Sequence, residues 1–236
     1  MRMKNPIIVA LDVPTAEQAI ALAQQVAPAV GAFKIGSELF TAAGPDIVRK
    51  IRATGASIFL DLKFHDIPNT VAKAIASAVR LDVQMITIHT GGGLTMMQAA
   101  EESAQKTAEQ AGLNAPLVLG VTVLTSMESS DLAGVGITAG VGQQVERLAQ
   151  LAARAGLRGL VCSPLEVAGL RQSLPSHMQF VTPGIRTGDD AAGDQKRTLS
   201  AKEAMEAGAS WLVIGRPIYA APNPREAAEK IRESLA

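Results

Sequence analysis

Short apolar runs alternate with helical patterns along the whole chain, and this rhythm constrains the fold more than any other feature. Each run is four or five residues long and mostly apolar, as expected for a strand buried on both faces of a parallel sheet. The runs predict strands at Ile7–Leu11, Ala32–Ile35, Ser57–Leu60, Met85–His89, Leu117–Val121, Gly159–Cys162, Gln179–Thr182 and Trp211–Ile214. The intervening patterns predict helices at Thr15–Ala27, Pro45–Ala53, Asn69–Leu81, Leu94–Ala111, Gly142–Ala155, Pro164–Gln172, Ser200–Ala207 and Pro224–Ser234.

Eight strand–helix units without a break in composition indicate an α/β protein built as a single (β/α)8 TIM barrel over residues 1–236. A length of 236 residues is common for one such barrel. A doubly wound open sheet is the alternative, but no Gly-x-Gly-x-x-Gly follows the first predicted strand.

Composition limits the classes of partner. The formal net charge is zero and the pI is about 6.8, so no overall basic field favours nucleic acid or an anionic membrane. Aromatic residues make up only 3% of the chain, which leaves few platforms for stacking bases. The N-terminal residues lack the apolar segment of a signal peptide, and no apolar stretch is long enough to span a bilayer. We therefore expect a soluble cytoplasmic protein.

The only cysteine is Cys162, which follows Leu160 and Val161 in an apolar run. It cannot form an internal disulfide, and we expect a buried, inert thiol rather than a nucleophile. The sequence has no Cys-x-x-Cys motif and no Cys/His cluster of the kind that binds a metal.

Three charged residues follow the third predicted strand within six positions: Asp61, Lys63 and Asp66. Because side chains alternate along a strand, Asp61 and Lys63 point to the same face. A carboxylate and an ammonium group at the end of a buried strand are costly unless something uses them. Lys34 interrupts another apolar strand and faces opposite to both of its neighbours. A structural ion pair is the alternative interpretation for Asp61 and Lys63.

Barrel active sites lie at the carboxyl ends of the strands, and those ends are polar here. Asp12 follows the first strand, although it could instead cap the next helix. His89 ends the fourth strand, where a hydrogen-bonded core histidine is the expected role. Thr125 follows the fifth strand and could be ordinary loop polarity. The opposite ends of the strands have no such accumulation.

The last two strands lead to a predicted phosphate site. Gly215 and Arg216 follow strand eight, where a glycine permits close approach of a ligand and an arginine can bind phosphate through two hydrogen bonds. Arg186 follows strand seven, and barrels often bind phosphate at these two loops. The polar loop at 187–198 is expected to act as a lid, with a solvated surface loop as the alternative.

Several of these residues lie in motifs that resemble those of a known enzyme family. The run Asp-Leu-Lys-Phe-His-Asp-Ile-Pro-Asn-Thr at 61–70 resembles the signature of the orotidine 5′-phosphate decarboxylase family, most closely its bacterial branch. The similarity extends from end to end, through Leu-Asp-Val at 11–13, Phe-Lys-Ile-Gly at 33–36, Val-Thr-Pro-Gly-Ile-Arg at 181–186 and Val-Ile-Gly-Arg-Pro-Ile at 213–218.

The resemblance implies a homodimeric enzyme that converts orotidine 5′-phosphate to uridine 5′-phosphate and CO2, the last step of de novo pyrimidine nucleotide synthesis, with neither metal nor organic cofactor. It implies that Lys63 donates the proton and that Lys34, Asp61 and Asp66 complete the charged array. It further implies substrate binding by Asp12, Lys34, Asp61, Ile67, Thr70, Thr125, Arg186, Gln195, Gly215 and Arg216, with Asp66 and Thr70 reaching into the partner subunit's site.

Two other functions remain open from sequence. A magnesium-dependent sugar-phosphate lyase, similar to 3-keto-gulonate 6-phosphate decarboxylase or hexulose phosphate synthase, also has Asp-x-Lys-x-x-Asp, but those relatives have an acidic metal ligand where this chain has Lys34. A cation at that position would repel magnesium. A barrel that binds a phosphate ligand without catalysis is the third possibility.

Overall fold

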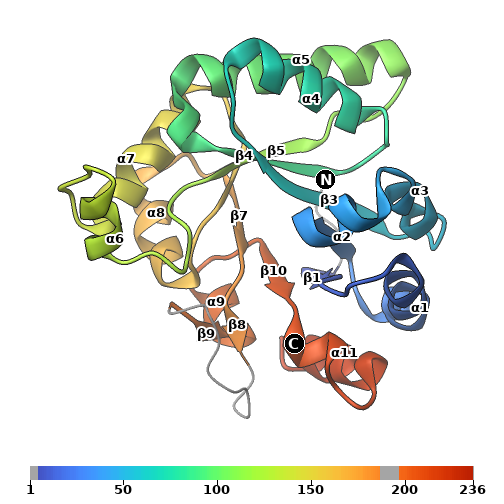
Figure 1. Cartoon of the computed structure of the whole chain (residues 1–236). Coiled ribbons are helices and arrows are strands. Elements are labelled where there is room, and N and C mark those ends of the chain that lie inside the picture. Colours follow the sequence, from blue (N-terminus) through green and yellow to red (C-terminus); the bar gives the residue numbers. More distant parts are fainter. Residues whose placement is uncertain (1–4, 187–196, 236) are drawn as a thin grey trace.

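The computed structural model describes residues 5–186 and 197–235, and these form a closed barrel of parallel strands surrounded by helices (Figure 1). The predicted fold class is confirmed. The barrel strands are β1 (Ile7–Ala10), β2 (Ala32–Gly36), β3 (Ser57–Phe64), β4 (Met85–His89), β5 (Leu117–Val121), β6 (Gly159–Val161), β7 (Gln179–Thr182) and β10 (Trp211–Ile214). Each strand pairs in parallel with its neighbours, and pairing of β1 with β10 closes the ring.

One helix or more follows each strand and covers the outside of the barrel, as Figure 1 shows. The helices that correspond to the predicted ones are α1 (Ala16–Val26), α3 (Asp46–Arg52), α4 (Pro68–Val79), α5 (Gly93–Ala111), α7 (Val141–Arg154), α8 (Val167–Ser173), α9 (Ala201–Glu206) and α11 (Pro224–Glu233). The last helix packs against the first, so the two ends of the barrel sequence meet. No helix in the described residues is long and apolar enough to cross a membrane.

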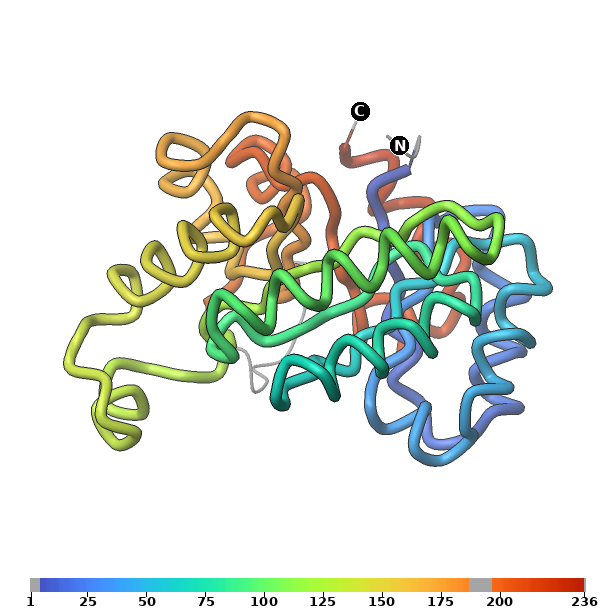
Figure 2. Tube along the Cα trace, turned by 90° about the horizontal axis from the view of Figure 1, so that it is seen from above, coloured from blue at the N-terminus to red at the C-terminus, as the bar shows by residue number. Residues whose placement is uncertain are grey.

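The sequence reasoning missed several short elements. These are α2 (Ser37–Ala43), α6 (Ser129–Gly134), α10 (Arg216–Tyr219), and the two-stranded parallel sheet of β8 (Ile185–Arg186) and β9 (Leu199–Ser200). Helix α2 follows β2 without a loop, and α6 is held by a capping box between Glu128 and Asp131. Figure 2 shows that the α6 segment projects away from the barrel. Three 3-10 turns lie at Ala27–Ala29, Thr90–Gly92 and Pro164–Glu166, so the helix predicted at Pro164–Gln172 begins as such a turn.

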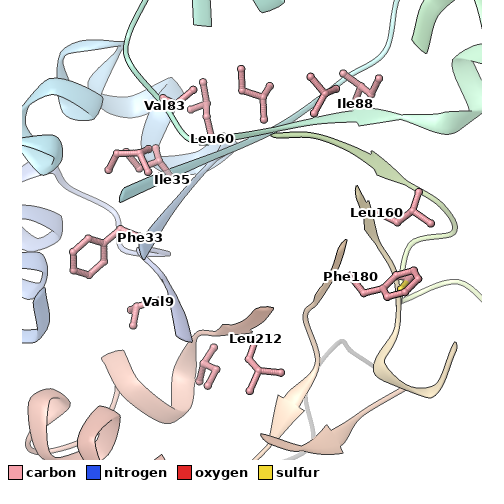
Figure 3. Packing of buried hydrophobic residues seen from close by; sticks show 14 of the residues in the cluster. Val9, Phe33, Ile35, Leu60, Val83, Ile88, Leu160, Phe180 and Leu212 are labelled. Carbon is pink, nitrogen blue, oxygen red and sulfur yellow. The ribbon is translucent and has the colours of Figure 1, made fainter. Parts of the chain in front are cut away.

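The main core lies between the strands and the helices. Outward-facing strand residues such as Phe33, Ile35 and Phe180 are fully buried there (Figure 3). A smaller cluster, which includes Phe59, Met85 and Trp211, fills the inside of the barrel. This alternation places Lys34, between Phe33 and Ile35, on the inner side of β2, as its sequence position predicts.

Strand β3 is longer than predicted, because it continues through the charged residues to Phe64. Leu60 pairs with Ile86 and Phe64 pairs with Ile88, so four steps along β3 match only two along β4. The extra residues form a bulge, a device that redirects side chains beside active sites. The residues at 61–63 therefore interrupt the regular pairing without ending the strand.

Candidate active site

A cavity of about 580 Å³ opens at the carboxyl ends of the barrel strands. Side chains and backbone from seven of the eight barrel strands, or from the connections that follow them, line it. Eight of the predicted catalytic and substrate-binding residues line this cavity: Asp12, Lys34, Asp61, Lys63, Thr125, Arg186, Gly215 and Arg216. The barrel therefore gathers into one space groups that are up to about two hundred positions apart in sequence.

Four charged groups form a continuous chain of alternating sign across one wall of this cavity. The Nζ atom of Lys34 lies 2.9 Å from Asp12 Oδ1 and 3.8 Å from Asp61 Oδ2. The Nζ atom of Lys63 lies 2.8 Å from Asp61 Oδ1 and 2.9 Å from Asp61 Oδ2. Asp61 thus lies between two ammonium groups, and the four charges cancel. That balance allows ionised groups to persist where a single buried charge would be strongly disfavoured.

Lys34 and Asp61 are the most enclosed members, since only 11% of each side chain is exposed. Close approach at Lys34 depends on Gly36, because a Cβ atom there would lie 3.0 Å from Lys34 Nζ and 3.5 Å from Asp12 Oδ1. A larger residue at this position would press against the ion pair.

Lys63 has a left-handed backbone conformation, with φ of 50°. Among the described non-glycine residues only Asp82 shares a positive φ, and aspartate adopts this region more readily than lysine does. The conformation costs about 1–3 kcal/mol and persists only where surrounding structure enforces it. It places Lys63 beside Asp61 at the bulge.

Sequence reasoning missed Thr87, a fully buried residue of β4. Its Oγ1 accepts a hydrogen bond from the Lys63 backbone N–H at 2.9 Å and donates one to Asp61 Oδ1 at 3.0 Å. The signal was present, because Thr87 shares the inner face with Met85 while the apolar residues Ile86 and Ile88 face outward. A polar residue at that position requires a partner inside the barrel.

Cationic groups gather on another side of the cavity. Arg186 ends β8, and the pairing of β8 with β9 holds it there. Gly215 precedes α10, which begins with Arg216. Both guanidinium groups line the cavity together with the backbone of Gly215. This side suits an anion with several oxygen atoms, while the charged chain offers a closely spaced set of donors and acceptors.

Three predicted site residues do not line this cavity. Asp66 and Ile67 lie on the exposed connection from β3 into α4, and Thr70 is exposed in the first turn of α4. The Asp66 carboxylate accepts a hydrogen bond from the backbone N–H of Ile67 at 2.6 Å, and Ile67 is 66% exposed although it is apolar. Gln195 and positions 187–196 of the predicted lid lie outside the described residues.

His89 differs from the expectation of a hydrogen-bonded core histidine. It is only partly buried, and its ring centroid lies 5.5 Å from that of His65. Burial lowers the pKa of His89, and the neighbouring His65 and Lys63 lower it further, whereas Asp61 opposes them. Among the described residues, no group of three or more His, Cys, Asp or Glu side chains is arranged to hold a metal ion.

Cys162 is buried, as predicted, and is part of the cavity wall. Burial raises the pKa of its thiol to about 12. Since the thiolate is the nucleophilic form, this residue stays unreactive at neutral pH.

The closed parallel barrel and the charged cavity at its strand ends define a (β/α)8-barrel enzyme. The model of the orotidine 5′-phosphate decarboxylase / HUMPS family matches residues 5–231. The chain belongs to this family.

Individual relatives support this family assignment. The chain is 49% identical over 234 residues to an orotidine 5′-phosphate decarboxylase of Mannheimia succiniciproducens, covering 99% of this chain and 98% of the relative. It is 50% identical over 233 residues to that of Opitutus terrae, covering 99% of both chains. Among solved structures, an orotidine 5′-phosphate decarboxylase from Lactobacillus acidophilus superposes with a TM-score of 0.87 at 35% identity, covering 98% of this chain and 99% of the other.

Proposed function

We propose that this protein decarboxylates orotidine 5′-phosphate to uridine 5′-phosphate and CO2, the last step of de novo pyrimidine nucleotide synthesis. The observation that carries the proposal is the alternating chain of Asp12, Lys34, Asp61 and Lys63 in a cavity that Arg186 and Arg216 also line. Relatives that are 49% and 50% identical over 99% of this chain are orotidine 5′-phosphate decarboxylases.

The reaction demands what this array offers. Loss of CO2 from C6 of the pyrimidine leaves a carbanion in an orbital that the ring cannot delocalise. Without an electron sink, stabilisation must be electrostatic, and a fixed ammonium group beside C6 provides it. Lys63 is assigned this role, after which it donates a proton to the carbon.

Asp61 has two assigned effects. It holds Lys63 in position through both of its carboxylate oxygens, and with Lys34 it keeps the array electrically balanced. It would also face the carboxylate of the substrate, where two like charges raise the energy of the bound ground state. Positioning of Lys63 is the effect that the hydrogen bonds support directly.

The remaining cavity residues are assigned to binding. Asp12 and Lys34 are assigned to the ribose, and Thr125 and Gln195 to the pyrimidine. The phosphate is assigned to Arg186, Gly215 and Arg216, which line the same cavity as the charged chain. Binding energy from a phosphate remote from C6 can then be used for closure and desolvation rather than for holding the substrate alone. Closure of the 187–198 segment belongs to this proposal.

A homodimer is part of the proposal. Asp66, Ile67 and Thr70 lie outside the cavity of their own barrel and are exposed. An isoleucine that is 66% exposed beside two polar residues suits burial by a second subunit. We assign Asp66 and Thr70 to the cavity of the partner, with a reciprocal arrangement in a symmetric pair. The same proposal places the enzyme in the cytoplasm, where its nucleotide substrate would be made.

The magnesium-dependent sugar-phosphate lyase is the alternative function, and the side chains available to bind a cation separate the two. The Lys34 ammonium group lies within 4 Å of the carboxylates of both Asp12 and Asp61. A divalent cation held by those carboxylates would meet a positive charge, which disfavours the lyase.

An ultraviolet assay of orotidine 5′-phosphate conversion, with and without EDTA, tests these assignments. We expect turnover that exhaustive chelation does not diminish. Loss of turnover that magnesium restores would support the lyase instead. Tight binding of uridine 5′-phosphate without any turnover would indicate a non-catalytic binding barrel.

A further inference from the structure

The buried residue Thr87 joins the two central members of the charged chain, Asp61 and Lys63, through a single hydroxyl group. We propose that Thr87 is a positioning residue for decarboxylation, which holds the Lys63 backbone in its left-handed conformation and orients the Asp61 carboxylate. This inference rests on the function proposed above. Thr87 does not line the cavity, so it would act through its two neighbours rather than on the substrate.

The bulge explains why a side chain is needed here. Leu60 pairs with Ile86 and Phe64 with Ile88, and Thr87 alone opposes the three residues at 61–63. The Lys63 N–H is therefore out of register with the β4 backbone. It bonds the Thr87 hydroxyl instead, at 2.9 Å. A buried N–H without a partner would be costly, so this bond favours the observed backbone.

The Thr87 hydroxyl group accepts one hydrogen bond and donates another, and the direction of each is fixed. Because the Lys63 N–H donates to Oγ1, the one hydroxyl proton is available for Asp61 Oδ1, which lies 3.0 Å away. The same Oδ1 atom accepts from Lys63 Nζ at 2.8 Å. Thr87, Asp61 and Lys63 thus form a closed loop of hydrogen bonds through both the backbone and the side chain of the lysine.

Removal of the hydroxyl breaks this loop at two points. The Lys63 backbone loses the acceptor that favours a positive φ, and the Asp61 carboxylate loses the donor that restricts its rotation. The ammonium group would then be less accurately placed, while the arginine side of the cavity would be unchanged. Small displacements of a catalytic group reduce turnover by about 10–100-fold.

Three variants test this. Thr87→Val keeps the shape and removes the hydroxyl, whereas Thr87→Ser keeps the hydroxyl and removes a methyl group. Thr90→Val is the matched control, because Thr90 is also fully buried and its hydroxyl donates to the Val121 carbonyl at 2.8 Å, away from Asp61 and Lys63. Thr87→Ala replaces Thr87→Val should the latter not fold.

We expect kcat to fall about 10–100-fold in Thr87→Val and to stay within about threefold of wild type in Thr87→Ser and Thr90→Val. The Kd for uridine 5′-phosphate, measured by calorimetry, should change less than about threefold in all of them, since its phosphate contacts are intact. A packing role predicts the opposite order, with Thr87→Ser affected and Thr87→Val spared. That order of effects would overturn the inference. Equal losses of kcat in Thr87→Val and Thr90→Val would overturn it as well, and so would wild-type turnover in Thr87→Val.

A crystal structure of Thr87→Val separates this inference from the proposed function. The inference expects Lys63 to leave the left-handed region or its Nζ atom to move away from Asp61. An unchanged Lys63 would refute the positioning role whatever the reaction is. Absence of decarboxylation by the wild-type protein would instead refute the proposed function, and a displaced Lys63 in the variant would still support the structural claim.

Discussion

Lys63 Nζ lies within hydrogen-bonding distance of both carboxylate oxygens of Asp61, at 2.8 and 2.9 Å, although only one residue separates the two in sequence. A regular strand would place both side chains on one face, and the bulge with its positive φ at Lys63 directs the ammonium group onto the carboxylate. The local backbone therefore builds this ion pair.

Lys63→Ala should reduce kcat by at least about 100–1000-fold, the scale for loss of a group that stabilises charge in the transition state. The fold should survive because Lys34 still neutralises Asp61 at 3.8 Å. Steady-state kinetics and circular dichroism measure the two effects. The exposed Lys106→Ala variant on α5 is the control and should match wild type. Near-normal turnover in folded Lys63→Ala would remove the central assignment.

Arg216→Ala should lower kcat/KM by an amount equivalent to about 2–4 kcal/mol, as for truncation of one partner of a buried charge pair. The reason is that Arg216 is assigned to the phosphate. Phosphite added to orotidine should partly restore turnover in wild type, if phosphate binding promotes closure. The exposed Arg232→Ala variant on α11 serves as control. Equal kcat/KM for orotidine and its phosphate would exclude this assignment.

Subunit mixing tests the shared site. Lys63→Ala and Asp66→Ala proteins should each be inactive, yet after exchange their mixture should recover about a quarter of wild-type activity per site. Half of the dimers would be mixed, and each mixed dimer would have one undamaged site of two. If Asp66 serves its own barrel, every site keeps one defect. No recovery after exchange verified by mass spectrometry would then return Asp66 to a role within its own subunit.

The stability of the protein should depend on His89 at mildly acidic pH. Burial, His65 and Lys63 lower the pKa of His89 in the folded state, so the unfolded chain binds the proton first as pH falls. The contribution of neutral His89 is fully present above the unfolded pKa of about 6.5 and is lost as pH falls toward the lower folded pKa. His89→Gln should therefore lose less unfolding free energy than wild type between about pH 7 and 5.

The difference should be below about 1 kcal/mol, because His89 is only partly buried and solvent screens its neighbours. Urea denaturation at a series of pH values measures it. A matched His177→Gln change on the exposed surface is the control. A His89→Gln protein with the same pH dependence as wild type would contradict the assignment of this effect to His89.

The sequence by itself determined where the strands lie. Four predicted strands, including Met85–His89 and Leu117–Val121, have the observed bounds. Strands buried on both faces need continuous apolar runs, and such runs are legible without a structure. The same logic located Lys34, because a charged residue within such a run must face the one polar region that the barrel has.

Tertiary structure alone decided which polar groups meet. The contact of Lys34 with Asp12 spans 22 positions and depends on parallel pairing of β1 with β2. The bulge in β3 was not predictable, because it is stabilised by the Thr87 hydroxyl from a neighbouring strand. The small β8–β9 sheet is likewise formed by segments too short to show a period of their own. A sequence pattern reports the environment of each residue, whereas strand pairing and register fix its partners.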